Sequence, residues 1–123
     1  MVPPVILEGT TPIYSVTLVD HNDKPINSIA LVSLTLTYYD GEALAILNNR
    51  SDQDILNANG VTVTAAGVVE WFWAVADATP IDRTQAIREH VAFLTWTWTT
   101  AQGLATGRHE AHFFVKLAYF GDT

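Results

Sequence analysis

Two histidines in the segment His109-Glu-Ala-His112 have the residue type of a metal ligand. The zinc-protease pattern places its histidines four residues apart on a helix, whereas these two are three residues apart in a segment that alternates like a strand. Side chains of a strand point alternately to its two faces, so the two rings are predicted to lie on opposite faces. His90 and His109 begin two predicted strands and form a better pair, although a half-exposed end residue with a hydrogen-bonded ring is the simpler interpretation of each. We therefore expect no metal site and no cofactor.

Acyl-transfer and carboxylate chemistry have no specific support in the sequence. A nucleophilic serine in a G-x-S-x-G turn needs glycine neighbours, which are missing at all four candidates: Ser15, Ser28, Ser33 and Ser51. Two carboxylate pairs in predicted loops have the oxygen ligands that calcium prefers: Asp52 with Asp54, and Asp77 with Asp82. Neither pair belongs to the dense D-x-[DN]-x-[DN]-G loop of a calcium site, so solvated turn residues are the simpler interpretation. We expect no catalytic residue, and a protein that is not an enzyme.

The four tryptophans form two pairs with i, i+2 spacing, Trp71 with Trp73 and Trp96 with Trp98. On a strand each pair shares one face, and aliphatic neighbours on that face favour a buried position. The two pairs together are not expected to fit easily inside one small sandwich. If one pair faces outward, a protein interface is the first explanation and a saccharide platform the second.

The composition narrows the possible partners. With 13 acidic and 6 basic residues the formal net charge is −7, and the basic residues of the second half are dispersed, at Arg83, Arg88, Arg108 and Lys116. Phosphate binding needs clustered cations, so nucleic acid is not an expected partner. No apolar run approaches the ~18 residues of a membrane span, and the start of the chain lacks the basic and apolar regions of a signal peptide. Only 15% of residues are charged, which fits a protein that contacts other proteins over much of its surface.

Alternation of apolar and polar residues predicts an all-β domain over residues 1–123. The clearest strand is Leu31–Tyr39, with Val32, Leu34, Leu36 and Tyr38 on one face. Further strands are predicted at Ile13–Val19, Val61–Thr64, Val68–Val75, His90–Thr99 and His109–Tyr119. Prolines before Val5–Leu7 favour an edge strand or an arm, so that residues 1–9 form an extended segment.

The connections between these strands complete the predicted fold. The connection Ala65–Gly67 has the glycine of a hairpin, and Ile55–Leu56 is predicted as one helical turn. Turns are expected at Gln102–Gly103 and Thr106–Gly107, and Asp77–Glu89 as a longer crossover loop. Seven to eight strands with one crossover indicate an immunoglobulin-like Greek-key β-sandwich.

Most of the chain lies in segments that together resemble small structural proteins of tailed bacteriophages: EGTTPIYSVTLVD, SLTLTYYD, NNRSDQDILNANGVTVTAAGVVEWFW, REHVAFLTWTW and GRHEAHFFVKL. The resemblance implies an immunoglobulin-like domain present in many copies in the virion, as a head decoration protein or at the neck or tail. Its partners would be other virion proteins or further copies of itself, with synthesis in the host cytoplasm. The resemblance carries over no active-site motif.

Three segments are candidate contact regions: the arm Val2–Glu8, the polar loop Asn48–Asp54 and the crossover Asp77–Glu89. The residues proposed for contact are Val2, Pro3, Pro4, Val5, Asn48, Asn49, Arg50, Asp52, Asp77, Pro80, Asp82 and Arg83. The alternative function is a carbohydrate-binding sandwich module that uses an exposed tryptophan pair.

Overall fold

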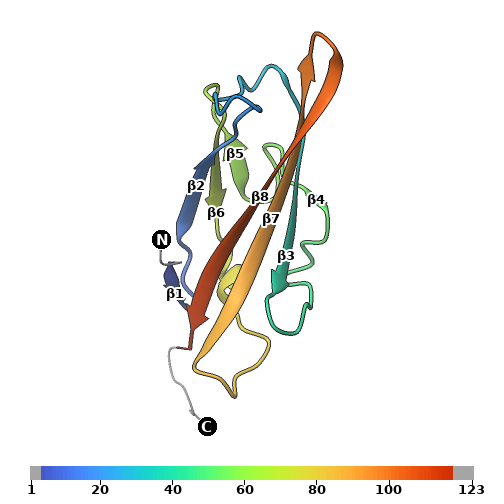
Figure 1. The fold of residues 1–123 in the computed structure, drawn as a ribbon. Helices are drawn as coiled ribbons and strands as arrows, with labels where there is room; N and C mark the ends of the chain where they lie inside the picture. The colour runs from blue at the N-terminus through green and yellow to red at the C-terminus, as the bar shows by residue number, and fades with distance from the viewer. Residues whose placement is uncertain (1–3, 118–123) are drawn as a thin grey trace.

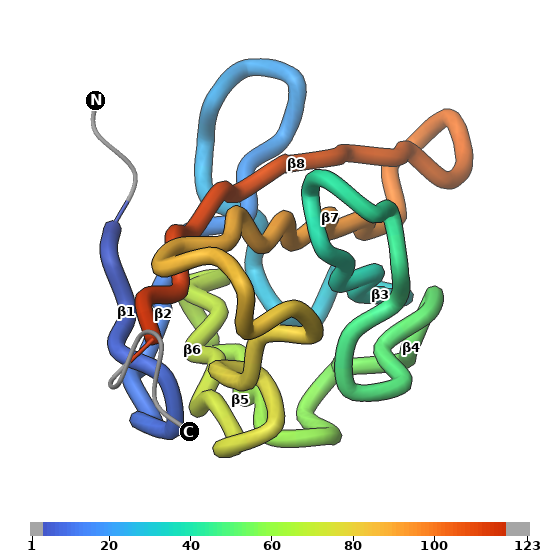
Figure 2. Tube along the Cα trace, turned by 90° about the horizontal axis from the view of Figure 1, so that it is seen from below, coloured from blue at the N-terminus to red at the C-terminus, as the bar shows by residue number. Residues whose placement is uncertain are grey.

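The structure, a computed structural model, describes residues 4–117 and consists of two β-sheets in two layers (Figures 1 and 2). The five-stranded sheet has the order β1-β8-β7-β3-β4, and the three-stranded sheet has the order β2-β6-β5. Besides one 3₁₀ turn, η1 (Val75–Ala78), the elements are β1 (Val5–Leu7), β2 (Ile13–Thr17), β3 (Leu31–Asp40), β4 (Gln53–Asp54), β5 (Val61–Val63), β6 (Val68–Phe72), β7 (Ile87–Thr100) and β8 (Gly103–Lys116). The predicted all-β class with two sheets is confirmed. No helix in this part of the chain is long and apolar enough to cross a membrane.

Alternating side chains of the facing sheets build the core between the layers. On β3, Leu34, Leu36 and Tyr38 are fully buried, and on β6 Val69 and Trp71 meet them from the other layer. Each strand thus presents every second residue to the core, because successive side chains of a strand point to opposite faces.

The beginning of β3 departs from strict alternation. The pairing with β7 shifts register between Leu31 and Ser33, and this irregularity turns Val32 outward, where it is 48% exposed, while Leu31 is buried. The prediction that Val32 shares the face of Leu34 is therefore wrong, since a bulge moves a side chain to the other face.

The hairpin of β7 and β8 is longer than predicted. Both strands have 14 residues, and a two-residue turn at Ala101–Gln102 joins them. Gly103 closes this turn with a φ of 118°, which glycine adopts without strain. Thr106–Gly107 lies inside β8 and makes no turn, so that part of the predicted connection is wrong.

Residues that precede β2 lie on the body of the molecule. β1 pairs in parallel with the end of β8, with Val5 opposite Phe114 and Leu7 opposite Lys116. This confirms the edge-strand interpretation. The Gly9 N–H then donates to the carbonyl of Ala78, 3.1 Å away, so residues 4–9 do not form a free arm, and Val2 and Pro3 lie outside the described residues.

The remaining segments differ from the prediction in detail. At Ile55–Leu56 the chain turns without forming a helix, and β6 ends at Phe72, before the predicted Val75. The crossover contains η1 and then runs without regular structure to Ile87, as expected for a long connection.

Candidate functional site

Two residues proposed for contact, Arg50 and Asp77, form a buried ion pair. Arg50 Nε donates to Asp77 Oδ1 at 2.7 Å and Nη2 donates to Oδ2 at 3.0 Å. The Asp77 carboxylate also accepts hydrogen bonds from the Asn48 side chain and from the backbone N–H of Ala74. The guanidinium lies 5.5 Å from the ring centroid of Trp71. A charge pair with this many partners anchors the polar loop and η1 to the core and is not available to a partner.

A second buried pair, Arg88 with Asp40, fixes the start of β7 to the end of β3. Arg88 Nε and Nη2 lie 3.0 and 2.8 Å from the two Asp40 carboxylate oxygens. Burial alone would raise the pKa of Asp40, but hydrogen bonds from the backbone N–H groups of Ala43 and Glu42 and from Arg88 outweigh it and lower that pKa. Asp40 is therefore ionised in the interior.

His90 lies between these two pairs and is fully buried, contrary to the predicted half-exposed position. The Tyr38 hydroxyl donates to the carbonyl of Asp77 at 2.6 Å and lies 2.8 Å from His90 Nδ1. Since the hydroxyl proton is already used, this contact assigns the ring proton to Nδ1. Burial lowers the pKa of His90, so the ring is neutral. Its Nε2 has no hydrogen-bond partner among residues 4–117.

The three histidines considered for metal binding lie apart. In the β7–β8 ladder His90 is opposite Phe113, and His109 is opposite Leu94. His109 Nε2 contacts the Tyr14 hydroxyl of β2 at 3.3 Å, whereas His112 lies on the other face of β8, between Glu89 and Glu110. Within the described residues, no group of three His, Asp or Glu side chains is arranged to hold a metal ion.

The carboxylate pairs also separate. Asp82 accepts from the backbone and hydroxyl of Thr84 in a local turn, whereas Asp77 is buried. Asp54 accepts from the backbone N–H of Leu56, and Asp52 is exposed. Asp52 lies in an exposed bend and Asp82 in a local turn, in agreement with the turn interpretation. Asp54 instead belongs to β4, and Asp77 is buried.

All four tryptophans are buried, so the prediction that both pairs do not fit inside is wrong. Their exposed fractions are 2% and 3% for Trp71 and Trp73, and 4% and 7% for Trp96 and Trp98. Tyr38 packs edge-on against Trp71 and Trp73 at centroid distances of 5.2 and 5.6 Å. An exposed indole pair for a saccharide is therefore not found.

Several other proposed contact residues do lie on the surface. Pro4, Val5, Asn48, Asn49, Asp52 and Arg83 are exposed, Asp82 is half-buried and Pro80 is buried. Arg83 forms an ion pair with Glu8. The loop and the crossover thus offer small polar surfaces beside their buried anchors.

Exposed apolar side chains collect where β1 and β8 end and β7 begins, a feature that sequence reasoning missed. Leu7, Lys116 and Ile87 lie side by side across the three strands. Two positions away on the same face, Phe114 lies between Val5 and Glu89. Val5, Leu7 and Ile87 are 57%, 47% and 45% exposed. We call Val5, Leu7, Ile87 and Phe114 the apolar patch.

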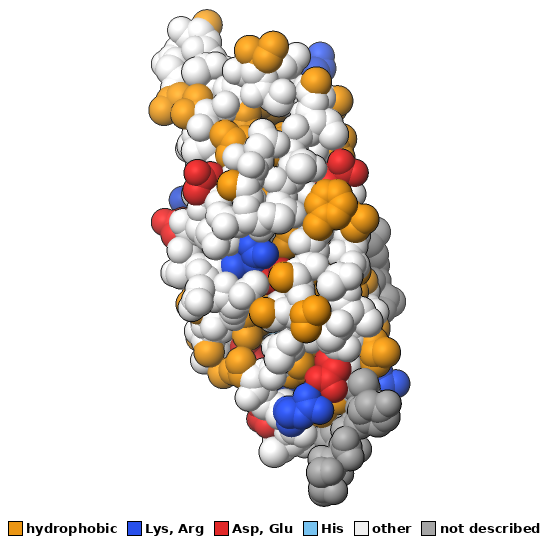
Figure 3. Space-filling model, turned by 180° about the vertical axis from the view of Figure 1, so that it is seen from behind, with side chains coloured by type: hydrophobic (Ala, Val, Ile, Leu, Met, Phe, Trp, Pro, Cys, Tyr) orange, Lys and Arg blue, Asp and Glu red, His pale blue; other side chains and the backbone are white. Residues whose placement is uncertain are grey.

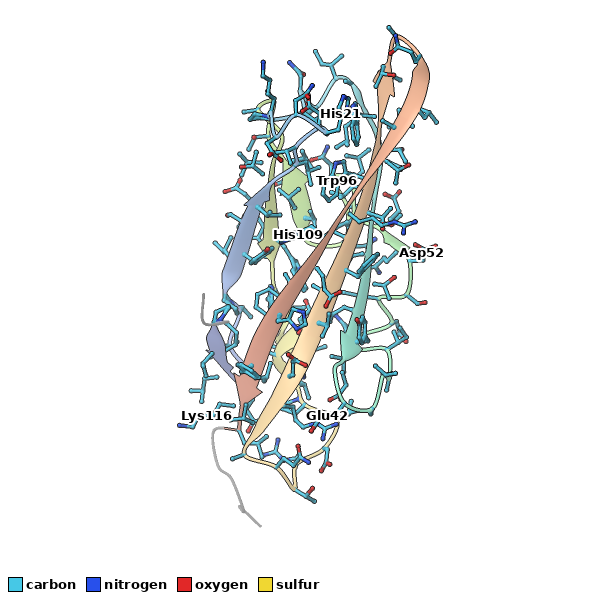
Figure 4. All side chains as sticks on the ribbon, in the orientation of Figure 1. His21, Glu42, Asp52, Trp96, His109 and Lys116 are labelled. Carbon is cyan, nitrogen blue, oxygen red and sulfur yellow. The ribbon has the colours of Figure 1, made fainter. Side chains whose placement is uncertain are left out.

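A second surface feature is a pair of hollows along the outer edge of β8. One, of about 250 Å³, is lined by residues of β2, of the loop after it and of the β7–β8 hairpin, among them Val16, His21 and Trp96. The other, of about 260 Å³, lies between Pro4, Tyr14 and Phe113. His109 lines both, so the hollows meet at this side chain, and Figure 4 shows it beside β8 below Trp96 and His21.

Comparisons of the chain with known protein families, with curated proteins and with solved structures gave no match.

Proposed function

We propose that this protein is a non-enzymatic structural protein of a tailed-bacteriophage virion that binds other virion proteins in multiple copies. The place proposed for it is the head surface, as a decoration protein, or the neck or head–tail region. The phage-like segments of the sequence and the surface described above support this role.

The apolar patch carries the proposal. Water-exposed Val5 and Leu7 on β1 and Ile87 on β7 lie on the two sides of β8, with Phe114 and the exposed Lys116 between them. Exposed apolar side chains gathered in this way are typical of protein contacts. In a multi-copy assembly a small patch on each subunit is enough, because many weak symmetric contacts add up.

The sparse surface charge supports the same role. Figure 3 shows the face that is hidden in Figure 1. Charged side chains on this face are few and are separated by uncharged areas. Interfaces between proteins are depleted of charge at their centres, so most of this surface is compatible with close packing against neighbours.

The strand order supports an immunoglobulin-like assignment of the sandwich. In that fold strands B, E and D form one sheet and strands C, F and G the other. Taking β2, β6 and β5 as B, E and D, and β3, β7 and β8 as C, F and G, reproduces both orders. β4 then occupies the place of an additional strand beside C.

Two experiments test the role. Negative-stain imaging of purified particles with an antibody against this chain should label the particles at regular positions, and particles without any label would reject the virion assignment. Particles assembled with the Leu7→Ser/Ile87→Ser variant should contain less of the protein. The matched control is Ile29→Ser, because Ile29 is 92% exposed but lies in a loop away from the patch.

A further inference from the structure

We propose that the outer edge of β8, from Leu104 to His112, binds an extended segment of a partner protein as an additional strand. The segment would have apolar residues at alternate positions and basic residues at its ends. This inference rests on the proposed protein-binding function and names the surface and the mode of one contact.

The tight hairpin determines which backbone groups of β8 point outward. Its two-residue turn makes Thr100 and Gly103 the closing pair, so odd-numbered residues of β8 bond to β7 and even-numbered residues face the other side. β1 confirms this direction: Phe114 N donates to the Pro4 carbonyl at 2.9 Å, and Glu8 N donates to the Lys116 carbonyl at 2.8 Å.

Above Phe114 this row of outward groups has no strand partner within residues 4–117. β1 and β7 are the neighbours of β8 among residues 4–117, and β1 is opposite only Phe114–Lys116. The outward N–H and C=O groups therefore remain open at Leu104, Thr106, Arg108, Glu110 and His112. An open row of this kind is a template for another strand.

Proline explains why β1 does not cover more of the edge. In this parallel ladder, successive donors of β1 and successive acceptors of β8 are each two residues apart. Glu8 N donates to the Lys116 carbonyl, so two steps earlier the nitrogen of residue 4 would face the His112 carbonyl. Residue 4 is proline and has no N–H to donate. The ladder ends there. The edge above contains no proline, and its charged side chains are Arg108 and Glu110.

The two hollows provide space for the side chains of an added strand. Side chains of that strand would point alternately to the outer face of the sheet and toward the hollows beneath the edge. Trp96, Val16 and Val19 line one hollow, and Tyr14, Ala111 and Phe113 line the other. These linings favour apolar residues at every second position of the partner.

Charge favours a basic partner over a second copy of this chain. The chain carries a net charge of −7, so two copies repel each other at long range. Asp20 lines the first hollow together with the exposed Arg108, and the exposed Glu110 lines the second. Lysine or arginine at the ends of the added strand would lie near these acids, which fixes its position along the edge.

Amide hydrogen exchange of the full chain, followed by NMR, tests the proposal with a synthetic peptide Lys-Val-Thr-Val-Thr-Val-Thr-Val-Lys. Exchange at Thr106, Arg108, Glu110 and His112 should slow by about tenfold or more at saturation, because these N–H groups acquire an acceptor. The odd-numbered amides, already bonded to β7, should change little. No slowing at the even-numbered positions would overturn the proposal.

Two substitutions at one position separate backbone pairing from side-chain binding. Arg108→Pro removes an outward N–H and no bond to β7, so it should abolish protection, whereas Arg108→Ala should keep it. Equal protection in both variants would contradict the proposal. A peptide with proline at its centre provides a test that does not depend on the folding of the Arg108→Pro variant, and it should fail to protect the wild-type chain.

Two further outcomes separate this inference from its rivals. A second copy of the chain would occupy the edge, and the proposed partner would be wrong, if three results coincide. The chain without peptide forms a dimer in sedimentation, and Arg108→Ala keeps this dimer. The valine peptide dissociates the dimer, whereas the proline peptide does not. Protection by the peptide together with unlabelled virions would reject the phage role and leave the edge as a strand-binding site.

Discussion

The ring of Trp96 occupies the space where a side chain at Gly107 would lie. A Cβ atom built on Gly107 would be 2.5 Å from Cε2 of Trp96, well inside contact distance. The two residues are opposite each other in the β7–β8 ladder, so the strand and the indole fit only because residue 107 is glycine.

Gly107→Ala should therefore destabilise the fold by about 1–3 kcal/mol, the usual cost of overpacking a core. Urea unfolding followed by tryptophan fluorescence measures this free energy. Thr106→Ala is the matched control, because its side chain is exposed on the same strand, and it should change the stability little. Equal stability of wild type and Gly107→Ala would show that the ring moves aside freely.

Trp96→Ala should cost about 3–5 kcal/mol, because a large buried side chain leaves a cavity. The same substitution in a Gly107→Ala background should cost less, since the added methyl group then meets no ring. Phe72→Ala is the control, because Phe72 is 45% exposed. A loss below about 1 kcal/mol for Trp96→Ala, far under the range for buried rings, would contradict the burial of this side chain.

Asp77→Asn should cost about 3–5 kcal/mol in the free energy of unfolding, because it leaves the Arg50 guanidinium buried without its counter-ion. The ion pair of Arg83 with Glu8, in which the Arg83 side chain is 53% exposed, is the comparison, and Arg83→Ala should cost only about 0–1 kcal/mol. Chemical denaturation of both variants at neutral pH checks the difference. Similar losses in both would mean that burial does not distinguish the two pairs.

His90 should make the fold less stable in weak acid. Its pKa is lowered from the ordinary 6.5, chiefly by burial, so between the folded and unfolded pKa values the unfolded chain binds more protons. Stability is then lost as the pH falls below about 6.5. His90→Gln should reduce this loss between about pH 7 and pH 5, the range above most carboxyl titrations. Urea unfolding at a series of pH values measures the slope.

His112 should change the pH dependence of stability in the direction opposite to His90. Glu89, and then Glu110, raise its pKa, so its contribution to stability is present below about 6.5 and is lost as the pH rises through the raised value. His112→Ala should therefore steepen the loss of stability in acid. If stability changes with pH by the same slope in wild type, His90→Gln and His112→Ala, neither ring governs the pH response.

Local alternation was enough to predict the strands, because the side chains that it places on one face are those that meet in the core. Leu34, Leu36 and Tyr38 illustrate this, and so does the hairpin around Gly67, whose φ is 81°. The bulge beside Val32 could not be predicted, because a register shift depends on the partner strand.

Contacts between distant residues account for the remaining differences. Arg50 and Asp77 lie 27 positions apart in two polar segments, and each alone resembles a solvated loop residue. The only signal was a lone arginine in the loop Asn48–Asp54. The burial of Trp96 and Trp98 depends on the small residues opposite them in β8, Gly107 and Ala105, and residue spacing along one strand does not reveal such partners.

The open edge of β8 and the apolar patch could not be predicted from the sequence either, because both depend on which strands become neighbours. The prolines before Val5 gave a correct sign of an edge strand. They did not indicate that β1 would pair with β8, or that the pairing would stop at Pro4.

The parallel pairing of β1 with β8 has a mechanical consequence. The chain enters β1 at Pro4 and leaves β8 at Leu117, at opposite ends of the two parallel strands, so a pull on Pro4 against Leu117 acts along both strands. The bonds from Phe114 to Pro4 and from Glu8 to Lys116 then bear the load together, in shear, and do not open one after another as in a peeled hairpin.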